Sequence, residues 1–165
     1  MSGQALRILF LSQRNSARSM MAEAIANSVG GGHFDAYSAG VRPSSGIDPL
    51  AVELLHHAGL EAPNHPPRHV REFSALDAPL LDFVFTLSDT AAGEAPPTWA
   101  GHPITAHWRC ADPERFETEA EKRLSLLRTR SELERRLRVF MNLPMESLDR
   151  MSLQAQISTL GSEPG

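Results

Sequence analysis

The sequence predicts an α/β fold with a mainly parallel sheet and helices on both of its faces. Short apolar segments alternate with segments of helical periodicity along the 165 residues, as in successive strand–helix–strand units. No internal repeat is present, and the tracts rich in proline and polar residues at 41–49, 62–68 and 93–103 read as loops. We therefore expect residues 1–165 to form one domain.

The first half of the chain supplies two strand–helix pairs. Residues 6–12 form a short apolar run typical of a buried strand, and the helical spacing that follows ends at three glycines, 30–32. Residues 34–40 alternate in polarity like a second strand. Residues 48–59 predict a helix, since aspartate, proline and glycine stand at their first, second and last positions. A further short helix is expected at 70–76.

The second half is predicted to add two strands and a long helix. Residues 81–87 and 104–108 are the strands. An amphipathic helix is expected from about 114 to 142, ended by Pro144, and a C-terminal helical extension follows at about 145–160. The apolar stripe of the long helix comprises Phe116, Ala120, Leu124, Leu127, Leu133, Leu137 and Phe140.

The charge pattern gives no indication of a nucleic-acid or membrane partner. The formal net charge is -4, and the basic residues of 122–138 alternate with Glu132 and Glu134, which is typical of a solvated helix face. The N-terminus lacks a secretory pattern, and no apolar run reaches the about 18 residues of a membrane span. Cys110, the sole cysteine, excludes an internal disulfide and is interpreted as a small structural residue. We expect a cytoplasmic protein without a cofactor; the long helix leaves a homodimer open.

Polar residues follow the predicted strands at the edge where parallel strands end together. Ser12, Ser38, Ser88 and the residues after Trp108 are expected there, and open α/β sheets bind their ligands at this edge.

The loop after the first strand has the composition of an anion site. Loop amides without partners and the positive end of a helix dipole attract oxyanions, and the planar fork of Arg18 can bind two oxygens. The loop contains no glycine, so a capped strand-to-helix turn with a surface arginine is an equal alternative at this point. The residues concerned are Ser12, Gln13, Arg14, Asn15, Ser16, Ala17, Arg18 and Ser19.

The segment ILFLSQRNSARSMMAEA at 8–24 resembles the phosphate loop of the low-molecular-weight protein tyrosine phosphatases and of the thioredoxin-coupled arsenate reductases that share their fold. Further segments resemble this superfamily in the same order: YSAG at 37–40, DFVFTLSD at 82–89 and HWRCADP at 107–113. The likeness is strongest to bacterial arsenate reductases. It implies an open four-stranded parallel sheet in the flavodoxin-like order 2-1-3-4.

The resemblance also implies a chemistry. In this superfamily a loop cysteine attacks phosphorus or arsenic, the loop amides and an arginine hold the oxygens, and an aspartic acid protonates the leaving oxygen. By position, Arg18 would bind the oxyanion, Asp112 would be the general acid, and Asn15 and Ser38 would support the loop. Asn15, Glu23 and Ser38 also match residues that help to bind potassium in some members.

The sequence departs from the superfamily at each cysteine of that chemistry. Ser12 stands at the nucleophile position, and a hydroxyl is too weak an acid to ionise there as a thiol does, so it would need an adjacent base. No histidine adjoins the loop in sequence, which leaves His107 as a spatial candidate. The relay positions of arsenate reduction fall on Ser88 and, depending on the alignment, on Ala95 or Pro96.

Three functions are consistent with this pattern. The first is a pseudoenzyme that binds phosphate, sulfate, arsenate or a phosphorylated ligand at 12–18, for example in an arsenic response, and lacks normal turnover. The second is a tyrosine phosphatase, a phosphomonoester hydrolase, carrying an engineered Cys-to-Ser substitution. The third is a partner-binding scaffold with a vestigial loop. The unusual pair Gln13 and Arg14 favours natural divergence, and hence the first function.

Overall fold

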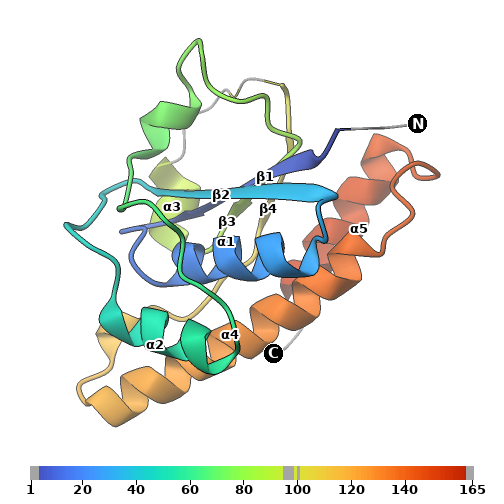
Figure 1. Ribbon diagram of the computed structural model, residues 1–165. Helices are drawn as coiled ribbons and strands as arrows, with labels where there is room; N and C mark the ends of the chain where they lie inside the picture. The colour runs from blue at the N-terminus through green and yellow to red at the C-terminus, as the bar shows by residue number, and fades with distance from the viewer. Residues whose placement is uncertain (1–3, 95–98, 100, 163–165) are drawn as a thin grey trace.

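A single four-stranded parallel sheet forms the centre of the molecule. The computed structural model describes residues 4–94, 99 and 101–162. The strands are β1 (Leu6–Ser12), β2 (Phe34–Gly40), β3 (Phe83–Thr86) and β4 (Ile104–His107). They pair in the order β2-β1-β3-β4 (Figure 1), which confirms the predicted α/β domain and its strand order.

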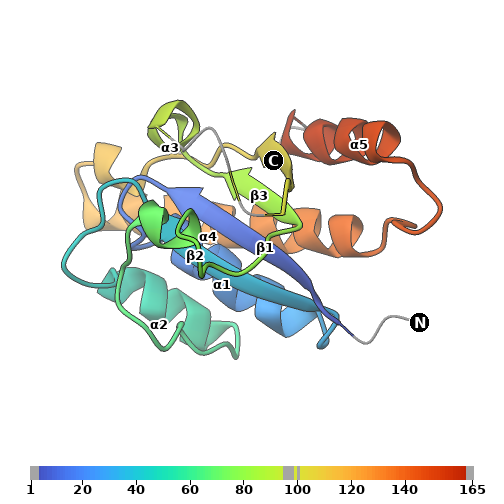
Figure 2. The same cartoon turned by 90° about the horizontal axis from the view of Figure 1, so that it is seen from above.

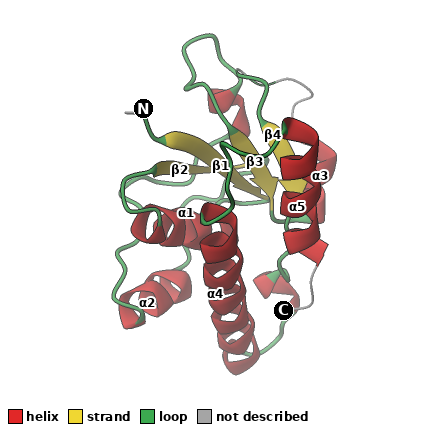
Figure 3. Cartoon of the chain, turned by 90° about the vertical axis from the view of Figure 1, so that its right-hand side faces the viewer, coloured by secondary structure: helices red, strands yellow, loops and turns green. Residues whose placement is uncertain are grey.

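Helices cover the two faces of the sheet unequally. One face carries α1 (Arg18–Val29), α2 (Pro49–His57), α4 (Glu119–Met141) and α5 (Arg150–Ser162), and Figure 3 shows α1, α2 and α4 below the strands. On the other face, the described residues form the short α3 (Asp89–Glu94) and the 3-10 helix η1 (Val70–Phe73). Seen from above in Figure 2, α1 and α4 pass behind the sheet.

An aromatic cluster fills the core on the heavily covered face. The rings of Phe85 and Trp108 stack with centroids 4.2 Å apart, and Phe140 of α4 meets both edge-on. Burial of each such side chain contributes about 1.5–3 kcal/mol. The indole nitrogen of Trp108 donates to the Ile157 carbonyl at 3.0 Å, which ties α5 to the end of β4.

Several element boundaries differ from the sequence-based predictions. The helix expected at 70–76 is the four-residue η1, and the strand expected at 81–87 is shortened to β3. The C-terminal helix begins at Arg150, because the chain turns twice in the segment after Pro144. The pattern of apolar residues predicts where a helix or strand lies along the chain. The residue at which it ends also depends on contacts with other elements and is less predictable.

The prediction for the long helix was wrong in its first two turns. Thr118 caps α4 in a capping box with Glu121, so Phe116 lies outside the helix. The buried face then starts at Ser125 and Leu126, whereas Leu124 is 49% exposed. Further along the helix, the predicted stripe is buried at Leu133, Leu137 and Phe140. The polar residues Ser125, Thr129 and Arg136 are buried beside it, which the apolar pattern did not indicate.

No helix in the described ranges 4–94 and 101–162 combines the length and apolarity that a membrane span requires.

Candidate oxyanion site

The loop at 13–17 joins the carboxyl end of β1 to the first turn of α1. Gly40, the last residue of β2, packs directly against it. A Cβ atom at position 40 would lie 2.9 Å from both the carbonyl carbon of Arg14 and the nitrogen of Asn15. The glycine of the YSAG segment therefore allows β2 and the loop to approach each other so closely.

Asn15 is the centre of the hydrogen bonds that hold the loop. Its side-chain nitrogen donates to Ser19 Oγ at 2.8 Å and to Ser38 Oγ at 2.9 Å, and its side-chain oxygen accepts from the Arg68 amide at 3.0 Å. The residue is fully buried and has φ 51°, in the left-handed region that asparagine tolerates better than most residues. Asn15 and Ser38 thus lie where the resemblance placed them, in contact with each other.

Ser12 is buried at the bottom of the loop, and its hydroxyl hydrogen-bonds no histidine or carboxylate among the described residues. Ser12 Oγ lies 2.6 Å from Ser19 Oγ and accepts from the Asn15 amide at 3.2 Å. His107, the spatial candidate, is held elsewhere: its Nδ1 lies 2.8 Å from Thr86 Oγ1 and its Nε2 lies 3.0 Å from Asp89 Oδ1. Within the described part of the chain, no histidine hydrogen-bonds Ser12.

Arg18 points from α1 toward the segment that carries Asp112. Its guanidinium donates to the Cys110 carbonyl at 3.3 Å and lies 3.9 Å from Asp112 Oδ1. Burial lowers the pKa of Arg18, and the nearby charge of Asp112 opposes that shift. A buried arginine keeps its positive charge beside the loop, since its pKa lies far above neutrality. The predicted oxyanion ligand and the predicted general acid therefore face each other.

A chain of ion pairs frames the rim of the site. Lys122 of α4 lies 2.8 Å from Asp48 and 3.5 Å from Glu114, and Glu114 lies 3.7 Å from Arg14. The hydrogen bond to Asp48 raises the pKa of Lys122. A small hollow lies within this frame, lined by Ser12, Arg14, Ser16, Ala17, Arg18, Asp48, Asp112, Pro113 and Glu114.

Sequence reasoning missed three of these rim residues. Asp48 was expected only as a helix cap, and it does accept from the Leu50 amide at 2.9 Å. Lys122 and Glu114 lie far from the loop in the sequence. The packing of α4 beside α2 brings Lys122 to Asp48, and Glu114 lies in the segment before α4, within reach of Lys122 and Arg14. No short-range pattern could have indicated them.

The residues matched to potassium ligands also come together. Glu23 is buried, and its carboxylate accepts from Ser38 Oγ at 2.6 Å and lies 2.8 Å from His65 Nε2. His65 therefore already contacts the carboxylate on which a cation would depend. Nowhere in the described ranges do three or more His, Cys, Asp or Glu residues form a metal-binding group. The potassium role of Asn15, Glu23 and Ser38 stays a prediction.

The relay positions provide no redox chemistry in the described part of the chain. Ser88 is buried and accepts from the Ala91 amide at 3.0 Å, which caps α3. Ala95 and Pro96 lie outside the described residues. Cys110 is 3% exposed, and burial raises the pKa of its thiol to about 12. Cys110 is thus a protonated core residue, as interpreted from the sequence, and not a nucleophile.

Residues 7–155 match the model of the low molecular weight phosphotyrosine protein phosphatase family, and the chain belongs to this family. It is 35% identical to the arsenate reductase of Bacillus subtilis (strain 168) over 137 residues, which span 81% of this chain and 93% of that protein. It is 30% identical to the glutaredoxin arsenate reductase of Synechocystis sp. (strain ATCC 27184 / PCC 6803 / Kazusa) over 108 residues, 66% of this chain and 79% of that protein.

Solved structures of similar proteins show the same fold. The arsenate reductase from Archaeoglobus fulgidus DSM 4304 superimposes with a TM-score of 0.60 at 27% identity, over 79% of this chain and 98% of that one. An arsenate reductase in the phosphate binding state gives a TM-score of 0.66 at 25% identity, over 82% of this chain and 96% of that one. The resemblance inferred from the sequence motifs is confirmed at the level of family and fold.

Proposed function

We propose that the protein binds tetrahedral oxyanions, such as phosphate, sulfate, arsenate or a phosphorylated ligand, at the loop 12–18 and lacks normal turnover. The observation that carries this proposal is the pairing of a buried Arg18 with a Ser12 hydroxyl that hydrogen-bonds no histidine or carboxylate among the described residues. Arg18 would bind the anion, and the un-ionised hydroxyl of Ser12 could not attack it.

Binding is supported by three features of the loop. The 12-residue helix α1 directs the positive end of its dipole at the loop. Arg18 adds a charged fork whose geometry suits two oxygens of one anion. The hydrogen bonds of Asn15 hold the loop in its shape, so little conformational entropy would be lost on binding. A similar arsenate reductase is known in a phosphate binding state.

The absence of turnover follows from the atom at position 12. A thiol at a helix N-terminus beside an arginine is ionised near neutral pH, but the same environment cannot ionise a hydroxyl. Ser19 Oγ and the Asn15 amide, the groups around Ser12, are hydrogen-bond partners and not general bases. Asp112 can donate a proton to a leaving group, yet it has no ionised nucleophile to assist. Reduction of arsenate would also need accessible thiols, and the buried Cys110 supplies none.

Calorimetric titration with phosphate, sulfate and arsenate tests the binding. We expect at least one anion to bind with a Kd of about 1 mM or tighter. Arg18→Gln should weaken that binding at least about tenfold, because it removes a charge-assisted fork. Arg42→Gln is the matched control, since Arg42 is an exposed arginine that pairs with Glu94. If no anion binds, or if Arg18→Gln binds as well as the control, the scaffold function is favoured instead.

One observation also supports a second function, that of a tyrosine phosphatase with an engineered Ser12. Asp112 and Arg18 face each other beside position 12, which is the arrangement that a working phosphatase of this family would need. The codon at position 12 of the natural gene separates this function from the pseudoenzyme.

A further inference from the structure

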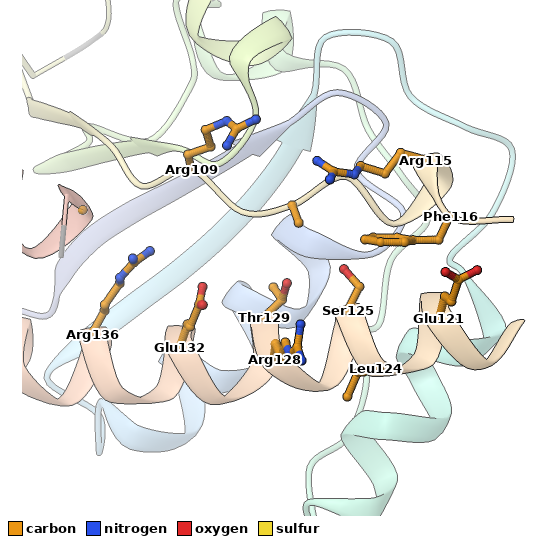
Figure 4. Close-up of a pocket in the computed structure, with 12 residues that line it drawn as sticks. Arg109, Arg115, Phe116, Glu121, Leu124, Ser125, Arg128, Thr129, Glu132 and Arg136 are labelled. Carbon is orange, nitrogen blue, oxygen red and sulfur yellow. The ribbon is translucent and has the colours of Figure 1, made fainter. Parts of the chain in front are cut away.

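A second pocket lies behind the segment 109–116, away from the oxyanion loop. It has a volume of about 740 Å³, within the range of small-molecule sites, roughly 300–1,000 Å³. Figure 4 shows one wall formed by α4 and the other by the segment 109–116. Part of the basic stretch of α4 lines this pocket. From the sequence, that stretch was interpreted as a solvated helix face.

A buried hydroxyl without a partner points into this pocket. Ser125 is 6% exposed, and its Oγ has no hydrogen-bond partner among the described residues. Figure 4 shows the hydroxyl directed from α4 toward the opposite wall, next to Thr129. A buried hydroxyl left unpaired is unfavourable, so its position favours a polar ligand that would accept or donate a hydrogen bond there.

The charged lining of the pocket favours an anion. Four arginines stand against two glutamates. Glu121 is already engaged by Thr118 in the capping box of α4, and Arg109 pairs with Asp89 at 3.1 Å, so arginines still outnumber glutamates at the pocket when both are set aside. The guanidinium of Arg115 lies 5.2 Å from the centre of the Phe116 ring, which places a cation and an apolar surface side by side. The four arginines are Arg109, Arg115, Arg128 and Arg136.

We propose that this pocket binds a small organic oxyanion, a carboxylate or a phosphate ester with an apolar body. The arginines hold the anionic group, Ser125 Oγ hydrogen-bonds to it, and Phe116 and Leu124 contact the apolar part. Carboxylates and phosphates share the planar arginine fork as their preferred partner, so the same lining suits both.

The pocket and the oxyanion site share one wall. Within the segment 109–116, the Cys110 carbonyl and Asp112 face Arg18, whereas Arg109 and Arg115 line the pocket. A ligand in the pocket therefore contacts the segment that positions Asp112. The two sites are nevertheless separate, because none of the residues lining the pocket also lines the hollow at the loop.

Nuclear magnetic resonance of the full ¹⁵N-labelled chain tests the proposal, with benzoate and phenyl phosphate as the carboxylate and phosphate probes. We expect saturable shifts of the amides of Ala111, Ser125 and Arg128, with a Kd of about 1 mM or tighter for at least one probe. The probe that binds better identifies the preferred anionic group.

Variants then separate this pocket from the oxyanion loop. Arg128→Gln changes an exposed residue and should weaken the probe at least about fivefold. Ser125→Val, which removes the hydroxyl, should also weaken it. The matched control is Arg138→Gln, at an exposed arginine of the same helix that pairs with Glu134. Arg18→Gln should leave the shifts of the pocket unchanged, whatever it does at the loop.

Three results would overturn the proposal. The first is the absence of saturable shifts at the pocket with both probes. The second is a set of shifts confined to 12–18 and lost in Arg18→Gln. The third is equal affinity of Arg128→Gln and Arg138→Gln. The first and third results do not depend on oxyanion binding at the loop, and the second would show binding at the loop without binding at the pocket, so the two proposals can fail separately.

Discussion

The oxyanion loop at 12–19 and the segment 107–116 that faces it are held in different ways. The loop is buried, and short hydrogen bonds from Asn15, Ser19 and Ser38 fix it from within. The facing segment is more exposed, and side-chain ion pairs hold its Arg109 and Glu114. A buried hydrogen-bonded network is costly to disturb, whereas exposed ion pairs contribute about 0–1 kcal/mol each.

The hydrogen bonds that hold the proposed anion loop come mainly from Asn15, Ser19 and Ser38, and Ser12 takes part in them through its hydroxyl. We therefore expect the shape of the loop to depend little on whether residue 12 can act as a nucleophile. The loop is therefore expected to be rigid, and the facing segment to adapt.

Ser12→Cys should give the largest effect, since it changes the chemistry without disturbing the support. A thiolate at the start of α1 beside Arg18 should hydrolyse an aryl phosphate at least about a hundredfold faster than the serine protein. Steady-state release of the phenol measures this rate. Adding Asp112→Asn should lower the new rate by about 10²–10⁴. An inactive Ser12→Cys protein that still folds would show that the rest of the machinery is not intact.

Asn15→Ala should be the most destabilising change in the loop. It removes two buried hydrogen bonds and one part-buried one and leaves alanine in the left-handed region, at a combined cost of about 2–4 kcal/mol. Urea unfolding measures the loss. Asn142→Ala, at an exposed asparagine with a single hydrogen bond to Arg138, is the matched control and should cost less than about 1 kcal/mol. Equal losses in both variants would contradict a rigid loop.

The stability should fall in alkali because of Cys110. Burial raises the pKa of its thiol from an ordinary 9.0 to about 12. Between these values the unfolded chain loses the proton and the folded chain keeps it, so the stability present below pH 9 declines as pH rises. The slope from this group is at most about 1.4 kcal/mol per pH unit.

Denaturant unfolding of wild type and Cys110→Ala at several pH values isolates this contribution. The difference between the two proteins should change steadily from pH 9 upward and stay constant below it. The thiol should also resist a disulfide reagent at pH 8 until the chain is unfolded. Rapid modification of the folded protein would mean that Cys110 is accessible.

Glu114→Gln should give the smallest effect, because it acts on the exposed rim. The change removes ion pairs with Arg14 and Lys122 and should cost less than about 1 kcal/mol. The difference should shrink further in high salt, which screens exposed charges. Thermal unfolding at low and high ionic strength provides the measurement. A loss as large as that of Asn15→Ala would remove the distinction between the two regions.

Sequence reasoning succeeded where the pattern was local. The run of β1, the polar loop and the start of α1 are contiguous, so apolar periodicity and turn composition were enough to place them. It failed at the start of α4, because the helix begins after the capping residue Thr118 and not at about residue 114. It also missed the pocket, since Ser125 and Arg109 come from segments that meet only in the folded chain.

The family, the order of the elements and the hydroxyl at position 12 could be read from the residues alone. These follow from residue identity and local spacing, and the low acidity of a hydroxyl is a property of the side chain itself. The tertiary structure was needed to show that His107 contacts Thr86 and Asp89 and that Cys110 is buried. Such facts depend on contacts between residues far apart in the chain, and packing alone sets those distances.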